Sequence, residues 1–136
     1  MQLLCTVEMT SEVVFDKIIK LKDDNAPGDD GIIPEFLKKL ASVISQPLAI
    51  IFRRSVAEGV VLQEWKTANI TPLFKKRSRS DPGNYRHVSL TSYVGKILET
   101  IIKEKLLGHL SLNSLINASQ YGFLLRKSCL TNFLYF

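Results

Sequence analysis

The chain has 136 residues, of which 46% are hydrophobic, and this length can bury one modest core, so it suits one domain or a piece of one. Its 18 Lys and Arg residues against 13 Asp and Glu residues give a formal charge of +5, which favours a partner that carries phosphate, although a solvated basic turn is the commoner meaning of such an excess. Two domains are not expected, and the excess positive charge gathers at Lys75, Lys76, Arg77 and Arg79.

A first helix is predicted after Thr10 and Ser11, either of which can cap its first turn. The polar run at 21–31, LKDDNAPGDDG, contains Asn, Pro and two Gly, and we therefore predict a loop in which Gly28 and Gly31 supply backbone freedom. The apolar stripe of the helix recurs at helical spacing and consists of Val14, Phe15, Ile18 and Leu21.

Two further helices are predicted before residue 60. Pro34 suits the first turn of one helix, and Pro47 is expected to break or kink it. The next helix is expected to end at Gly59, in the usual position just past a C-terminus. The predicted buried stripes are Phe36, Leu37, Leu40, Ala41 and Ile44 in one helix and Leu48, Ile51, Phe52 and Val56 in the other.

A β-hairpin is predicted between residues 68 and 90. The segment ANITPLF at 68–74 is short, β-branched and aromatic enough to form a strand, and Pro72 places that strand at an edge. RSRSDPGN at 77–84 has turn chemistry, and YRHVSL at 85–90 alternates well enough to return as the second strand. Trp65, just before the hairpin, is expected to anchor a turn against the core.

The clearest amphipathic helix begins near Val94 and is expected to end before Gly108, which introduces a looser segment. QYGF at 120–123 then opens a last apolar run. Together these segments predict an α+β fold that is mostly helical and contains one β-hairpin. The stripe of the amphipathic helix consists of Val94, Ile97, Leu98, Ile101, Ile102 and Leu106.

Several classes of site are excluded by spacing. Cys5 and Cys129 have neither metal-ligand spacing nor a cluster of histidines, which excludes a zinc site and a disulfide framework. His87 and His109 are too far apart to support a catalytic base for hydrolysis or acyl transfer. No apolar run approaches the ~18 residues of a membrane span, and no secretory signal is present, so we expect an intracellular protein, cytoplasmic or nuclear, with no membrane partner.

Four segments carry a recognisable pattern: NAPGDDGIIPEFLKKL at 25–40, WKTANITPLFKKRSRSDPGNYRHVSL at 65–90, VGKILE at 94–99 and QYGFLLRKSCLTN at 120–132. In this order they resemble the reverse transcriptases, or RNA-directed DNA polymerases, of non-LTR, LINE-like retrotransposons. The resemblance covers most of the chain. It implies that residues 1–136 are a partial reverse transcriptase domain, with the fingers and the start of the palm but without the catalytic palm strands.

The resemblance also implies roles for two sets of residues. In the family the basic residues of the hairpin contact the incoming nucleotide, and the QYGF motif lines the template. Physical chemistry agrees for the hairpin, because a basic ribbon can bring ammonium and guanidinium groups to a triphosphate. The alternatives are a solvated turn with Arg86 in a structural ion pair, and aromatic side chains that belong to the core. The residues implied are Lys75, Lys76 and Arg86 for the nucleotide and Gln120, Tyr121 and Phe123 for the template.

No metal site or cofactor is predicted in this chain. The aspartates Asp23, Asp24, Asp29 and Asp30 lie in a loop, where helix capping and solvation are their expected roles. The resemblance implies that the complete enzyme uses Mg²⁺, held by aspartates on strands that lie further along the family's sequence. We therefore expect the chain alone to lack nucleotidyltransferase activity.

The chain departs from the family pattern mostly at turns. Arg77 stands in place of a glycine and costs about 1 kcal/mol if it takes a positive φ. His87 stands in place of a proline and frees a backbone N–H that a strand edge must then satisfy. The remaining departures are Asp29 and Leu62 for prolines and Leu125 and Arg126 for a Pro-Gly turn.

Three functions remain open. The chain can be an inactive fragment of a retrotransposon polymerase that contacts RNA or DNA template and deoxynucleotide. It can instead be a basic nucleic-acid-binding module without enzymatic activity, or a helical interaction fragment or functionless translated relic. Helices that lack their palm sheet are expected to expose apolar surface and to self-associate.

Overall fold

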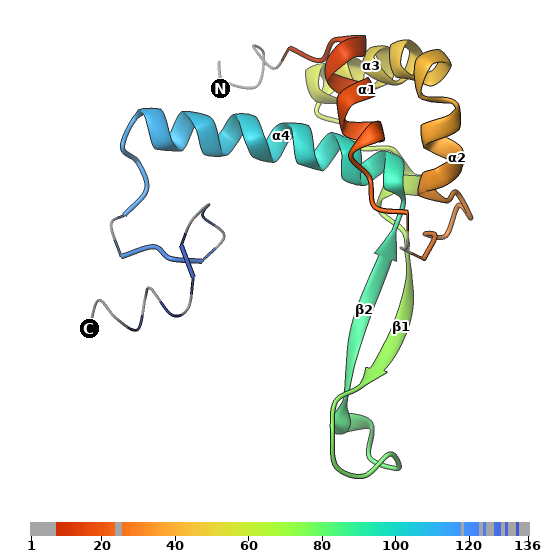
Figure 1. Cartoon of the computed structure of the whole chain (residues 1–136), viewed down its shortest axis with the longest axis vertical. Coiled ribbons are helices and arrows are strands. Elements are labelled where there is room, and N and C mark those ends of the chain that lie inside the picture. Colours follow the sequence, from red (N-terminus) through yellow and green to blue (C-terminus); the bar gives the residue numbers. More distant parts are fainter. Residues whose placement is uncertain are drawn as a thin grey trace. The chain divides into compact units, whose positions relative to one another are not determined.

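The computed structural model describes residues 8–23, 26–117, 119–122, 124, 127, 128, 130 and 133. The described part contains four α-helices and one two-stranded antiparallel sheet, which confirms the predicted α+β fold (Figure 1). It forms two compact units, Met1–Ile102 and Lys103–Phe136. The elements are α1 (Ser11–Ile19), α2 (Pro34–Lys39), α3 (Ala41–Glu58), the short 3-10 helix η2 (Gln63–Trp65), β1 (Ala68–Phe74), the 3-10 helix η3 (Pro82–Asn84), β2 (Tyr85–Thr91) and α4 (Tyr93–Leu112), which begins in the first unit and ends in the second.

Helix α1 starts as predicted. The Thr10 side chain accepts a hydrogen bond from the Val13 N–H at 3.3 Å, which satisfies one of the free donors of the first turn. Hydrogen bonds from its own backbone, and then from Thr10 and Ser11, lower the pKa of the Glu12 carboxyl. The helix is anchored in the core at two positions one turn apart, Val14 and Ile18. The predicted stripe is wrong at Phe15, which is 38% exposed.

The boundary between the next two helices lies at Leu40 and not at Pro47 as predicted. Leu40 has φ −98° and ψ 2°, which ends α2, and α3 begins at the following residue. Helix α3 then runs through Pro47, which is exposed. Its buried stripe continues past Pro47, and the packing of this stripe outweighs the backbone hydrogen bond that a proline removes. The stripe consists of Ala41, Ser45, Ala49, Phe52 and Ser55.

Small side chains, rather than the large ones predicted, dominate the buried stripe of α3. Phe36 is 53% exposed and Ile51 is 40% exposed, so the predicted stripes are wrong at both positions. The small side chains of alanine and serine let α1 pack closely along α3. The buried Ser45 hydroxyl donates a hydrogen bond to the Ala41 carbonyl, so this donor is satisfied. The helix ends at Gly59 with φ 66°, as predicted for a C-terminal glycine.

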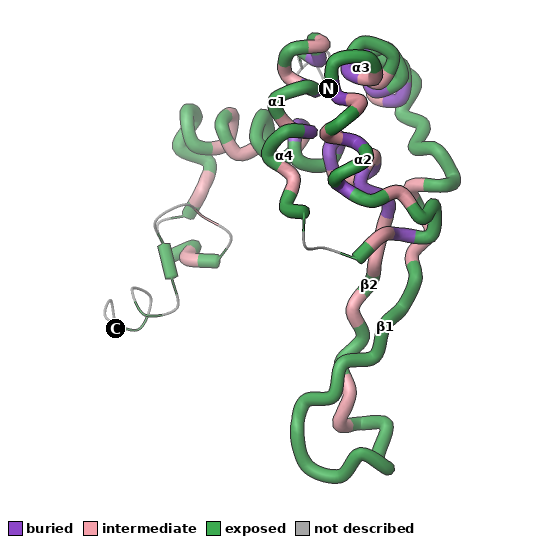
Figure 2. The backbone as a smooth tube through the Cα atoms, turned by 45° about the vertical axis from the view of Figure 1, so that its right-hand side comes forward, coloured by how far each residue is buried: buried purple, intermediate pink, exposed green. Residues whose placement is uncertain are grey.

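The core of the first unit is centred on Phe52, which is fully buried. The Trp65 ring meets the Phe52 ring edge to face, with centroids 5.6 Å apart, which confirms that Trp65 anchors the turn before β1. Figure 2 shows that the buried residues gather among the helices and at the start of α4, whereas β1 is exposed along nearly its whole length. The buried apolar residues are Met9, Val14, Ile18, Leu37, Ala41, Ala49, Phe52, Tyr93, Ile97, Leu98 and Ile101.

The loop before α2 is fastened to the base of the hairpin. Gly28 is buried, and a Cβ atom placed on it would lie 2.7 Å from the Thr91 carbonyl carbon and 2.8 Å from the Ser92 nitrogen. The Tyr93 hydroxyl donates to the Ala26 carbonyl at 3.1 Å. The backbone of this loop therefore packs directly on the chain where β2 passes into α4, and only glycine fits at residue 28.

Helix α4 is longer than predicted, because it continues past Gly108 to Leu112. A glycine in a helix interior costs about 1 kcal/mol relative to alanine, which weakens a helix without ending it. The helix buries Ile97, Leu98 and Ile101 as predicted, but Leu106 is 47% exposed.

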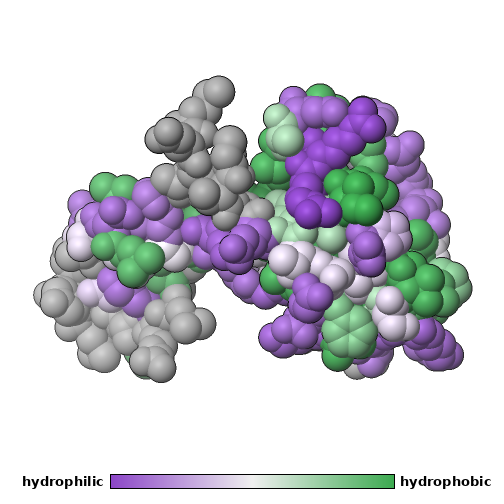
Figure 3. Space-filling view, turned by 90° about the horizontal axis from the view of Figure 1, so that it is seen from above, coloured by the Kyte–Doolittle hydropathy of each residue, from purple (hydrophilic) through white to green (hydrophobic). Residues whose placement is uncertain are grey.

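Apolar side chains reach the surface of the helical part of the first unit, as Figure 3 shows from above. Among them are Phe36, Val43 and Ile50, which are 53%, 70% and 50% exposed. This exposed apolar surface was predicted; the self-association expected from it stays a prediction. Within the described residues, no helix has both the length and the apolar character needed to cross a membrane.

Candidate functional site: the basic hairpin

The register of the hairpin places two of the predicted basic residues on one face. β1 and β2 pair antiparallel with Leu73 opposite Arg86. The Lys75 N–H donates to the Asn84 carbonyl at 2.8 Å, so the pairing continues one step beyond the strands. Side chains alternate between the two faces of a ribbon, and residue 75 therefore shares the face of Leu73 and Arg86. Lys75 and Arg86 are diagonal neighbours on that face.

The side chains of Lys75, Lys76 and Arg86 are exposed. Within the described part of the chain none of the three makes an ion pair, whereas the cations Lys38, Lys39 and Arg54 elsewhere do. The alternative that Arg86 serves a structural ion pair is therefore wrong for the described residues. Lys76 lies at the start of the turn, where the strand register no longer determines its face.

The turn between the strands is held by its own side chains. The Asn84 side-chain amide donates to the Ser78 carbonyl at 2.9 Å, and the Asp81 carboxylate accepts from the Gly83 N–H at 2.9 Å. The Tyr85 hydroxyl donates to the Arg79 carbonyl at 2.9 Å. These bonds span the turn from both sides, so the basic tip has a defined conformation although it is exposed.

An aromatic pair closes the end of the ribbon beneath the turn. The rings of Phe74 and Tyr85 lie opposite each other in the register, with centroids 5.4 Å apart. The Arg79 guanidinium lies 5.3 Å from the centroid of the Phe74 ring. Arg79 is thus held by a cation–π contact. Sequence reasoning did not find this contact, because the pairing of residues 74 and 85 depends on the register of the two strands.

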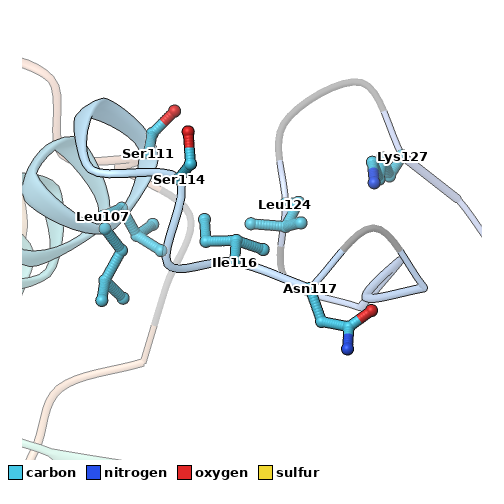
Figure 4. A pocket seen from close by; sticks show the side chains of 8 residues that line it. Leu107, Ser111, Ser114, Ile116, Asn117, Leu124 and Lys127 are labelled. Carbon is cyan, nitrogen blue, oxygen red and sulfur yellow. The ribbon is translucent and has the colours of Figure 1, made fainter.

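The predicted template residues belong to the second unit. The Gln120 side-chain amide donates to the Gly122 carbonyl at 2.9 Å, and the Lys127 ammonium lies 4.6 Å from the centroid of the half-buried Tyr121 ring. Phe123 lies outside the described residues. The same unit contains an open hollow of about 480 Å³, where Figure 4 shows Ile116 and Leu124 among the lining residues; Gln120 and Tyr121 do not line it.

The loop aspartates that the structure describes make local contacts. Asp23 pairs with Lys38 at 2.7 Å, and the Asp30 carboxylate accepts from the Ile32 N–H at 3.1 Å. Asp24 lies outside the described residues. Among the residues that are described, no group of three or more His, Cys, Asp or Glu side chains is placed to hold a metal ion.

Comparison with curated proteins shows which proteins this chain is similar to. The chain is 33% identical over 119 residues, 87% of its length, to the RNA-directed DNA polymerase from mobile element jockey of Drosophila melanogaster, and the match covers 13% of that protein. It is 32% identical over 101 residues, 73% of its length, to the retrovirus-related Pol polyprotein from type-1 retrotransposable element R1 of Bradysia coprophila, covering 10% of that protein. The chain is a relative of non-LTR retrotransposon reverse transcriptases.

This relationship confirms the resemblance found in the sequence. A probable RNA-directed DNA polymerase from transposon BS of Drosophila melanogaster is also similar, with 26% identity over 113 residues, which are 82% of the chain and 12% of that protein. No protein-family model matches the chain. The chain spans about a tenth of the length of the curated relatives that it matches.

One residue of this reverse transcriptase relative lies at a strained position. Arg77, where the resemblance implies a glycine, has φ 78°, a conformation that side chains with a Cβ rarely adopt. The condition under which Arg77 costs about 1 kcal/mol, a positive φ, is therefore met. The turn keeps its shape because the hydrogen bonds around it compensate for the strain.

Replacing Arg77 by glycine is expected to stabilise the hairpin by about 1 kcal/mol, because glycine adopts positive φ without a steric cost. Amide hydrogen exchange of β1 and β2 should then slow by about fivefold. Arg79→Gly removes the same charge two residues away but also the contact with Phe74, and it should speed exchange instead. Equal effects of the two substitutions would show that charge, and not φ, governs the turn.

Proposed function

We propose that the chain is part of an RNA-directed DNA polymerase of retrotransposon origin, in which the hairpin holds the phosphates of the incoming deoxynucleotide. The observation that carries this proposal is a pair of cations, Lys75 and Arg86, that share one face of an exposed ribbon without carboxylate partners among the described residues. The similarity to the RNA-directed DNA polymerase from mobile element jockey supports the assignment to a polymerase.

The geometry suits a triphosphate. Diagonal neighbours on one face of a ribbon lie roughly 7–8 Å apart at the backbone, and the long side chains of Lys75 and Arg86 can converge on one ligand of that size. Arg86 would bind two phosphate oxygens through its fork, and Lys75 would neutralise charge as a compact ammonium. Lys76 would add a third cation from the turn. A tip held by internal hydrogen bonds presents these groups with little further loss of entropy.

The template would be contacted by the second unit. We propose that Gln120, Tyr121 and Phe123 form this contact, with Tyr121 or Phe123 stacking on a base. The chemical step would require Mg²⁺ held by carboxylates of the rest of the polymerase. A polymerase of this kind would act in the cytoplasm or the nucleus, where its RNA or DNA template is found.

Neutralising the hairpin cations tests whether the hairpin contacts phosphate, which the proposal requires. In the variant Lys75→Gln, Lys76→Gln, Arg86→Gln, affinity for a labelled single-stranded RNA should fall, and the slope of log affinity against log salt concentration should become shallower by about 2, since each lost phosphate contact removes about 0.7. Fluorescence anisotropy between low and moderate salt measures both quantities.

A matched control separates the hairpin from bulk charge. The variant Lys20→Gln, Lys22→Gln, Arg53→Gln removes the same three charges from exposed positions on or after helices of the first unit, and it should leave the salt slope nearly unchanged. If both variants weaken binding equally, the affinity reflects net charge; if neither does, the hairpin does not contact phosphate.

The second candidate function is a basic nucleic-acid-binding module, and it rests on the same exposed cations. Unlike the first candidate, it does not require the rest of a polymerase. With Mg²⁺, a primed template and deoxynucleotides, the chain alone should incorporate no nucleotide under either candidate. If the polymerase segment that follows this region in jockey-type relatives is added and restores incorporation, the first candidate is favoured. RNA binding without any restoration favours the second.

A further inference from the structure

The tip of the hairpin contains two serine hydroxyls to which none of the roles above is given. Every residue from 71 to 83 is exposed, so the side chains of Ser78 and Ser80 meet solvent. Their hydroxyl oxygens lie 2.7 Å apart, and the Ser80 N–H donates to the Ser78 Oγ at 3.3 Å. The tip therefore presents a pair of hydroxyls among its positive charges.

The positive charges of the tip are centred on Ser78 and not on Ser80. Ser78 follows three successive cations and precedes a fourth, whereas Ser80 is followed directly by Asp81. The fourth cation, Arg79, lies against the Phe74 ring. Within the described part of the chain none of the four makes an ion pair, so no carboxylate there neutralises their charge. The four cations are Lys75, Lys76, Arg77 and Arg79.

We propose that Ser78 is the phosphorylation site of a serine kinase that selects basic residues before its target. Kinases discriminate among substrates by the pattern of charges around the acceptor, and three cations directly before a serine suit an acidic substrate groove. The kinase supplies ATP and Mg²⁺. The Ser78 Oγ forms a bond to the γ-phosphorus of ATP while the bond from that phosphorus to ADP breaks, and the hydroxyl proton passes to a carboxylate of the kinase.

The tip can open to reach a kinase while the strands stay paired. The bond from the Lys75 N–H to the Asn84 carbonyl lies at the end of the ladder, and Ser78 is three residues beyond it. Ser78 itself is held by the Asn84 side-chain amide on its carbonyl and by the Ser80 N–H on its hydroxyl. Such exposed bonds contribute roughly 1 kcal/mol each, and opening also relieves the strain of Arg77 at φ 78°. Local opening of the tip therefore costs far less than unfolding.

A phosphate on Ser78 changes the charge of the whole tip. Residues 75–81 carry four cations and one carboxylate, a formal charge of +3, and a phosphoserine adds about −1.5 to −2, which leaves only about +1. Arg77 and Arg79 flank the phosphate and can donate to its oxygens. The consequence rests on the function proposed above, because the internal phosphate then competes with nucleic acid for the same cations. Phosphorylation of Ser78 thus switches off phosphate binding by the hairpin.

Mass spectrometry tests the site independently of nucleic acid. After incubation of the full chain with Mg²⁺, ATP and a purified serine kinase that selects basic residues, one phosphate should be found on Ser78. Ser78→Ala should remove this phosphate, and the matched control Ser80→Ala should leave it in place. The variant Lys75→Gln, Lys76→Gln should slow phosphorylation by about tenfold, because the kinase loses two of the charges that it selects. A phosphate that appears on Ser80 in place of Ser78, or a chain that the kinase leaves unmodified, would overturn the proposal.

Fluorescence anisotropy with a labelled single-stranded RNA tests the consequence. The phosphorylated chain should bind about tenfold more weakly than the unmodified chain at low salt, and phosphatase treatment should restore the affinity. Unmodified Ser78→Ala should bind as the parent chain does, since its lost hydroxyl carries no charge. If the unmodified chain binds no RNA, the function proposed for the hairpin fails, whereas the phosphorylation site is decided by mass spectrometry. If the phosphorylated and unmodified chains bind RNA equally, RNA binding stands and its regulation through Ser78 is overturned.

Discussion

Replacing Phe52 by alanine is expected to lower the free energy of unfolding by about 3–5 kcal/mol, a large part of the stability of so small a unit. Phe52 is fully buried on α3, and the centroid of its ring lies 5.6 Å from the centroid of the Trp65 ring. Removing the ring leaves a cavity at the centre of the core and takes away the surface against which Trp65 packs.

Urea unfolding followed by circular dichroism and by Trp65 fluorescence measures this effect. Ile51→Ala, one residue away on the same helix, is the control, because Ile51 is 40% exposed and its loss should cost about 1 kcal/mol or less. The fluorescence of Trp65 should also become more solvent-like in the Phe52 variant before unfolding begins. Similar losses of stability for the two variants would mean that α3 does not bury the face described.

Replacing Gly28 by alanine is expected to destabilise the first unit by about 1–3 kcal/mol, as overpacking does in a core. The new Cβ would lie 2.7 Å from the carbonyl carbon of Thr91, which is backbone and cannot rotate away as a side chain can. Either the loop lifts from the base of the hairpin or the base itself moves. In both cases the hydrogen bond from Tyr93 to Ala26 is disturbed.

The matched control is Gly108→Ala in α4. Nothing lies within 4 Å of a Cβ at that position, and its backbone is helical, so alanine should stabilise by about 0.5–1 kcal/mol. Thermal unfolding of both variants should shift the midpoint in opposite directions. A shift in the same direction would show that the approach of Gly28 to Thr91 is not a tight contact in solution.

Local rules predicted much of the fold. Thr10 as a cap, Gly59 as a helix end and the hairpin with its turn were visible because each depends on neighbouring residues. Pro47 misled the prediction because the cost of a proline is local, whereas the buried stripe that outweighs it depends on α1 packing against α3. Ser45, Ala49 and Ser55 were missed in the buried stripe because large apolar side chains dominate the periodicity of a sequence.

The candidate site was predicted in part. The basic residues followed from the order of residue types in the hairpin. The cost at Arg77 was raised only as a condition, from the glycine that the resemblance implies at that position. The role of Gly28 did not, because its contact with Thr91 joins segments more than sixty residues apart, and a single sequence carries no signal of that pairing. The same limit applies to the shared face of Lys75 and Arg86, since it requires the register, which the turn bonds of Asn84 help to set.

The loop at Gly28 packs on the base of the hairpin, so a small change of angle there moves the distant tip by a larger distance. Each strand has seven residues, which extend roughly 23 Å at 3.3 Å per residue. A tilt of about 10° at the base would therefore displace the basic tip by roughly 4 Å, more than the length of a hydrogen bond. The contacts of Ala26 and Gly28 at the base of the hairpin thus help to determine the position of the Lys75 ammonium at its tip.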